Sequence, residues 1–168
     1  MNTAALISGL LARDLRALSR ELDAYPSEDA LWEKPPTIPN SAGTLAAHMA
    51  GNIRHYVGAV LGQSGYVRDR DAEFSGRRMP RAELQAGIAA AIHDVETVLP
   101  TLTDAQLATP FPQKVADLQV ETSEFLLHLA VHLTYHLGQV DYHRRLVGGS
   151  STSVSTVSPK ELRTARAS

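Results

Sequence analysis

Four long segments of this chain carry apolar residues every three or four positions, and this spacing predicts helices that each bury one face. The segments run over about 3–23, 41–61, 80–99 and 121–147. Clusters of proline at 33–40 and of glycine at 62–65 separate them. No segment alternates apolar and polar residues as a half-buried strand does. The sequence therefore predicts an all-α fold, a four-helix bundle.

The chain is long enough for one domain with a core of its own, at 168 residues. Shorter helical turns are predicted at 27–32 and at 103–106, where Thr103 and Gln106 have the spacing of a capping box. Gly148 and Gly149 end the last long segment. We expect a bundle domain over 1–148 and a disordered, Ser/Thr-rich tail over 149–168.

Composition excludes several classes of function. The chain has no cysteine, which excludes disulfides, thiolate metal sites, Fe–S clusters and nucleophilic thiols. Its net charge of −2 offers no basic surface for nucleic acid. No apolar stretch is long enough to cross a bilayer, and Met1-Asn2-Thr3 does not begin a signal peptide. We expect a cytoplasmic protein with a small-molecule substrate and no nucleic-acid or membrane partner.

Histidines on the second and fourth predicted helices are candidate metal ligands. His132 and His136 lie one turn apart on one face, and His48 lies beside apolar positions of the second helix. A buried imidazole needs a polar partner, since an unpaired one costs about 1–3 kcal/mol. In an up-and-down bundle the second and fourth helices lie diagonally across the core, so these faces can converge. Three imidazoles can then bind one ion and leave positions open for water or substrate.

The alternative interpretation is that these histidines are hydrogen-bonded core residues, because an H-x-x-x-H pair is weak evidence for a metal. His128 has the same spacing to His132 as His136 has, but it lies farther from the apolar flank. His128 is therefore placed around the site or in plain packing, and Asn52 and Gln139 are candidates to orient ligands or bind substrate. Packed or solvent-exposed positions are expected for the remaining histidines, His55, His93 and His143.

The charged loop predicted at 66–79 has two interpretations. Its arginines could receive the carboxylates of a cofactor, or they could form solvated ion pairs with the acidic residues of the same loop, which the pattern favours. The arginines are Arg68, Arg70, Arg77 and Arg78, and the acidic residues are Asp69, Asp71 and Glu73.

The motifs that carry the histidines resemble those of the DinB/YfiT-like family of bacterial helical bundles. The resemblance rests on the runs Leu45-Ala-Ala-His48-Met-Ala-Gly-Asn52 and Leu129-Ala-Val-His132-Leu-Thr-Tyr-His136-Leu-Gly-Gln139. It covers roughly 3–147 and implies a mirror variant of up-and-down topology, a His48, His132 and His136 metal triad, and a homodimer. Many members have Arg where this chain has Leu137, which weakens the case for an anion contact there.

The resemblance implies a site more firmly than a reaction. Some members transfer low-molecular-weight thiols such as bacillithiol, mycothiol or glutathione, and one branch isomerises maleylpyruvate. We expect a divalent ion, zinc or nickel first and iron or copper as alternatives, that activates an external thiol toward a small electrophile. The alternatives are a metal-dependent hydrolase and a non-catalytic, stress-related metal-binding dimer; the catalytic residues are not assigned.

Overall fold

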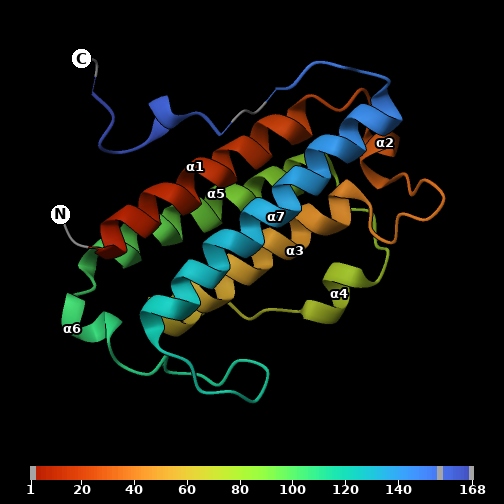
Figure 1. Ribbon diagram of the computed structural model, residues 1–168. Coiled ribbons are helices and arrows are strands. Elements are labelled where there is room, and N and C mark those ends of the chain that lie inside the picture. Colours follow the sequence, from red (N-terminus) through yellow and green to blue (C-terminus); the bar gives the residue numbers. More distant parts are fainter. Residues whose placement is uncertain (1–2, 155–156, 167–168) are drawn as a thin grey trace.

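The computed structural model describes residues 3–154 and 157–166, and within these ranges its regular structure is helical, without strands. Figure 1 shows the long helices along one another. The long helices are α1 (Thr3–Asp23), α3 (Ala42–Ile53) with its π-helical continuation η1 (Arg54–Leu61), α5 (Arg81–Val98) and α7 (Thr122–Gly148). The short ones are α2 (Glu28–Trp32), α4 (Arg70–Phe74), α6 (Asp104–Leu107) and the 3₁₀ turns η2 (Leu99–Thr101) and η3 (Pro159–Glu161). The predicted all-α bundle is confirmed.

Side-chain caps fix several helix starts. Ser41 accepts a hydrogen bond from the backbone N–H of Thr44 at the start of α3. The capping box of Thr103 and Gln106 is present at α6, as predicted. One expectation is wrong: 66–79 is not entirely loop. The segment contains the short helix α4, and Asp69 caps its start by accepting a hydrogen bond from the backbone N–H of Ala72.

Contacts between the long helices define which of them are neighbours. Helix α3 packs against α5 and α7, and α1 packs against the same two helices. The expectation that the second and fourth long helices lie diagonally is therefore wrong, because α3 and α7 are adjacent. The reason is that α1 and α3 lie diagonally across the bundle, which leaves α5 and α7 as the neighbours of both. Helix α5 also runs in the same direction as α3, since Ala50 faces Gly87 and Gly58 faces Asp94.

A buried ion pair joins α1 to α7 inside the bundle. Nε of Arg144 donates to Oε2 of Glu21 at 2.5 Å, and both side chains are almost fully buried. The second guanidinium nitrogen, Nη2, donates to Asp141 and to the carbonyl oxygen of Thr152. This network fixes the last turns of α7 against α1. Earlier along the same seam, the hydroxyl of Thr134 donates to buried Asp14 among apolar core residues.

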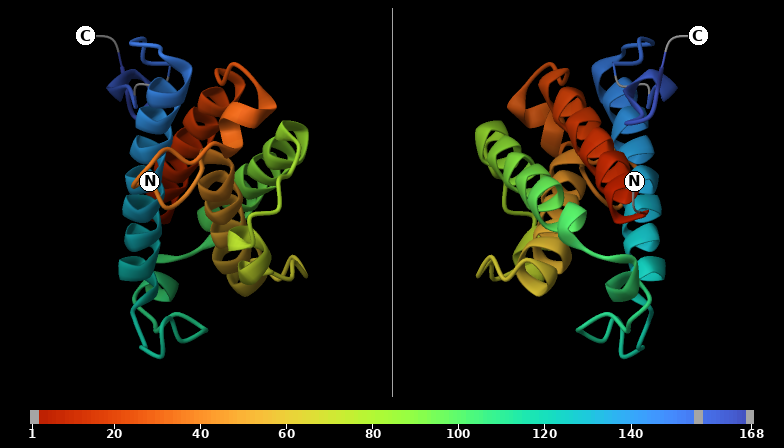
Figure 2. Two further views of the ribbon diagram at one scale, coloured as in Figure 1. Left: turned by 90° about the vertical axis from the view of Figure 1, so that its right-hand side faces the viewer. Right: turned by 90° about the vertical axis from the view of Figure 1, so that its left-hand side faces the viewer.

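The two ends of α7 differ in their surroundings. Gly149, in the left-handed conformation at φ 63°, follows its last residue, as the Gly-Gly pair predicts. The irregular segment 108–121 precedes α7 and lies at the opposite end of the bundle from α2 (Figure 2). The predicted domain boundary at 148 and the predicted disordered tail at 149–168 stay predictions. Residues 1–2 of the domain, and 155–156 and 167–168 of the tail, lie outside the described residues. Over the described ranges, none of the helices is both long and apolar enough to span a membrane.

Candidate metal centre

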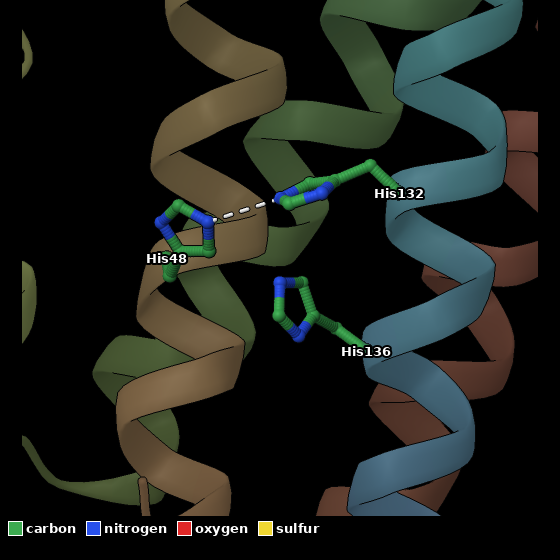
Figure 3. Close-up of side chains that lie close together, drawn as sticks. All are labelled: His48, His132 and His136. Atoms are coloured by element: carbon green, nitrogen blue, oxygen red, sulfur yellow. Dashed lines mark hydrogen bonds between the residues drawn. The ribbon is translucent and has the colours of Figure 1, made fainter. Parts of the chain in front are cut away.

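Three imidazoles from two adjacent helices converge between α3 and α7. His48 comes from α3, and His132 and His136 come from successive turns of α7; Figure 3 shows their rings pointing toward one another. One ring nitrogen from each lies within 4.8 Å of the others. The two Nε2 atoms of His48 and His132 are 3.2 Å apart. His48 is buried, and the other two histidines are half-buried.

The carboxylate of Glu73 sets the tautomer of His48. Burial raises the pKa of Glu73, but hydrogen bonds from Arg68 and His48 outweigh it, so the pKa is lowered and Glu73 is ionised. An ionised carboxylate only accepts, so Nδ1 of His48 donates its proton to Oε2 of Glu73, at 3.0 Å. Because Nδ1 is taken up by this hydrogen bond, Nε2 is the ring nitrogen of His48 that faces the two histidines of α7.

Arg68 holds Glu73 in this position. Its Nε and Nη2 donate to the two carboxylate oxygens of Glu73, each at 2.7 Å, in a bidentate pair. Both side chains are over nine-tenths buried. Phe74 packs on the His48 ring from the same short segment, with ring centroids 4.9 Å apart. The 66–79 segment thus forms an outer wall of the site.

Gln139 has the same effect on His136. Its Oε1 accepts a hydrogen bond from Nδ1 of His136 at 2.7 Å, one turn along α7. Because Nδ1 carries the proton, Nε2 of His136 presents a lone pair. Glu73 and Gln139 therefore each accept a hydrogen bond from Nδ1 and leave Nε2 of His48 and of His136 as the nitrogen that can bind a metal. The hydrogen-bond partners of metal-bound histidines act in the same way.

The two imidazoles of α7 suit a cation as neutral ligands. Burial and the neighbouring His136, His48 and His128 lower the pKa of His132 to about 4. Burial also lowers the pKa of His136, against the raising effect of its Gln139 hydrogen bond. Two nitrogens that bind one tetrahedral ion at about 2.0–2.1 Å lie about 3.3 Å apart, close to the distance between His48 and His132. The donor set, its protonation and its spacing fit a divalent ion.

The other candidate residues lie around this cluster in different ways. His128 is exposed and stacks on His132, with centroids 5.8 Å apart. Asn52 is buried one turn beyond His48, and its Oδ1 has no hydrogen-bond partner among the described residues. His143 is buried, with Tyr25 and the Glu33 carbonyl as partners of its ring nitrogens. The roles assigned to His128 and Asn52 stay predictions.

Sequence reasoning missed the pair of Glu73 and Arg68 as part of the site. It treated both as solvated charges of a loop, whereas both are buried against His48. A sequence signal existed in Gly51, three residues after His48. A Cβ at Gly51 would lie closer to Oε1 of Glu73 than van der Waals contact allows, so only glycine lets the carboxylate approach α3 here.

Fold and site together define an all-helical bundle whose adjacent α3 and α7 carry a three-histidine cluster suited to a metal ion. A family model described as DinB superfamily matches residues 10–140, most of the chain. The chain belongs to the DinB superfamily, as its motifs predict. Searches of curated proteins and of solved structures found no match.

Proposed function

We propose that this protein is a metal-dependent enzyme that transfers an external low-molecular-weight thiol to a small electrophile. The observation that carries the proposal is the convergence of three imidazoles, one ring nitrogen of each lying within 4.8 Å of the others. Three protein ligands leave coordination positions for a further molecule, as in catalytic rather than structural sites. His48, His132 and His136 are the proposed ligands of one divalent ion, zinc or nickel first.

A divalent ion on neutral imidazoles lowers the pKa of a thiol or water bound beside it. Glu73 and Gln139 hold His48 and His136 in the orientation and tautomer that this requires. The thiol comes from outside, because the chain has no cysteine. With a haloarene as electrophile, a carbon–sulfur bond forms, the carbon–halogen bond breaks, halide leaves with the electron pair, and the thiol proton goes to solvent.

Hydrolysis, the other enzymatic alternative, finds less support around the histidines. It needs a group beside the ion that is free to take a proton from water. The exposed imidazole of His128, which stacks on His132, is one candidate for this role. The carboxylate at the site, Glu73, is occupied by two hydrogen bonds from Arg68 and one from His48. A non-catalytic metal-binding dimer would need no open coordination position, which separates it from the thiol-transfer proposal.

The test is conjugation of a thiol to a reactive aryl halide. Protein loaded with zinc or nickel is mixed with bacillithiol, mycothiol or glutathione and 1-chloro-2,4-dinitrobenzene, and the thioether is followed by absorbance. We expect metal-dependent conjugation with at least one thiol and its loss in His132→Ala. Absence of metal-dependent conjugation with all three thiols, in protein shown to contain the metal, would remove the thiol-transfer proposal and leave the metal site standing.

A further inference from the structure

An apolar pocket opens between α3 and α7, next to the histidine cluster. It has a volume of about 330 Å³. The start of α3 contributes Leu45, the last turns of α7 contribute Tyr142 and Leu146, and the segment before α3 contributes Ile38. Tyr142 and Leu146 are largely exposed on α7, so the pocket opens to solvent along this wall.

Among the residues that the structure describes, no Asp, Glu, Lys or Arg lines this pocket. Its polar groups are the side chains of Asn40, Gln139 and His143 and the hydroxyl of Tyr142. His143 has its two ring nitrogens occupied by Tyr25 and the Glu33 carbonyl, so its ring is a wall and not a free base. Burying a charged ligand group without a partner is costly. The lining therefore favours an uncharged, apolar ligand, with the amides of Asn40 and Gln139 left for a neutral polar substituent.

The pocket adjoins the candidate metal centre through two residues. Gln139 lines the pocket, and its Oε1 accepts the hydrogen bond from His136. Leu45 lines it from α3, one helical turn before His48. Because α3 and α7 run antiparallel here, one turn toward the start of α3 and one turn toward the end of α7 both lead from the imidazoles to the pocket. A ligand in the pocket lies beside the histidines.

We propose that this pocket binds the apolar, uncharged body of the electrophilic substrate, an aromatic or alicyclic group of one or two rings. This assignment of substrate class rests on the proposed function. An apolar cavity of about 150 Å³ holds one benzene molecule, so 330 Å³ accommodates a substituted or fused ring. Acidic electrophiles are excluded by the same lining, since no arginine or lysine faces the pocket.

A matched pair of ligands tests the pocket without any reaction. The full-length chain, freed of metal by a chelator so that no carboxylate can bind an ion, is titrated with 2-naphthamide and with 2-naphthoate, followed by NMR. The two ligands have the same rings and differ in charge. We expect the amide to bind at least about tenfold more tightly, because the carboxylate would lose its hydration without gaining a partner.

Two variants fill the pocket from opposite walls. In Leu146→Trp and in Ile38→Trp the indole occupies part of the volume, and we expect the dissociation constant of 2-naphthamide to rise about tenfold in each. Both positions are partly exposed, so neither variant disturbs the core. The control is Leu118→Trp, which makes the same change at an equally exposed leucine in the segment before α7, outside the pocket.

Three results would overturn the proposal: equal affinity for the two ligands, binding that neither pocket variant weakens, or binding that Leu118→Trp weakens equally. A further result would also overturn the proposal: if the amide binds only at protein concentrations too low for self-association, a second copy of the chain covers the pocket. Since these titrations contain neither metal nor thiol, they are independent of the conjugation test. Failure of conjugation with intact binding would reject the reaction and keep the apolar pocket.

Discussion

At the scale of single residues, a neutral imidazole can bind a cation through only one nitrogen, and its other nitrogen decides which one. Nδ1 of His48 donates to Glu73, and Nδ1 of His136 donates to Gln139. Both Nε2 atoms are therefore free to bind a metal because of Glu73 and Gln139, which are not themselves proposed ligands. Substitutions of the ligand histidines and of their outer partners therefore test the metal site separately.

Loss of an outer partner such as Glu73 typically reduces metal affinity by about 10–100-fold. Replacing the ligand His132 by alanine should reduce zinc affinity further, by more than about 100-fold. The measurement is metal content by elemental analysis together with competition titration against a chelator. His128→Ala is the matched control, since His128 has the same helical spacing to His132 and is exposed. Equal loss in the two variants would show that His128 belongs to the ligand set.

Glu73→Gln should weaken zinc binding by about 10–100-fold, because the carboxylate that fixes His48 is replaced by an amide. Gly51→Ala should have the same effect, since its Cβ would displace the flexible end of Glu73 while changing stability little. Gly87→Ala is the control: its Cβ would meet only Cβ of Ala50, at an ordinary 3.6 Å. Unchanged zinc affinity in both Glu73→Gln and Gly51→Ala would reject a positioning role for Glu73.

At the scale of elements, α7 is fixed against α1 by charges as well as by apolar packing. The pair of Arg144 and Glu21 is buried, and such a pair is costly to break on one side because the remaining charge has no partner. The neighbouring Arg145 pairs with Asp141 from a position one-third exposed, where an ion pair contributes little.

Arg144→Leu should lower the free energy of unfolding by about 3–5 kcal/mol, since it leaves the Glu21 carboxylate buried alone. The double variant Glu21→Gln with Arg144→Leu should recover much of this loss. Chemical denaturation measures both. Arg145→Leu, the control, should cost no more than about 1 kcal/mol. Similar losses in Arg144→Leu and Arg145→Leu would contradict the buried-pair assignment.

The stability contributed by Glu21 should depend on pH. Burial outweighs the hydrogen bond and charge of Arg144, so the pKa of Glu21 is raised above 4.5 in the folded protein. A raised pKa gives stability that is fully present below pH 4.5 and is lost as the pH rises through the folded pKa. We expect Glu21→Gln, which does not titrate, to gain on the wild type in unfolding free energy between pH 4.5 and neutral pH. A constant difference across this range would contradict the raised pKa.

At the scale of the whole molecule, α7 leaves a large apolar surface on the outside of the bundle. Leu127, Val131 and Tyr135 recur every four residues on it and are 49%, 69% and 63% exposed. Monomeric proteins rarely leave an apolar stripe of this kind in water. We propose that it is the interface of a homodimer.

Val131→Glu should convert the dimer to a monomer, because it places a charge in the centre of that stripe. Light scattering after size-exclusion chromatography measures the mass. Val67→Glu makes the same change at a valine of the 66–79 segment that is 87% exposed, and should leave the mass unchanged. A monomeric wild type, or a dimer that survives Val131→Glu, would reject this interface.

Local pattern was enough for the helices and for the shared face of His132 and His136. Spacing of Leu and Ile every three or four residues marks a helix wherever it packs, and Thr103 and Gln106 satisfy their capping box within one turn. His132 and His136 share a face because the helix has 3.6 residues per turn. These features depend on neighbours in sequence, so the sequence by itself determined them.

Only the tertiary structure decided which helices are neighbours and what surrounds His48. The adjacency of α3 and α7 follows from the 24–41 connection, which carries the chain from α1 to the diagonal position in the bundle, and no periodicity encodes this path. Glu73 and Arg68 looked like solvated charges, yet they pack on a histidine 25 and 20 residues earlier in the chain. The physical reason is that burial and hydrogen-bond partners are properties of packing between segments, and a charge that is exposed in one arrangement fixes an imidazole in another.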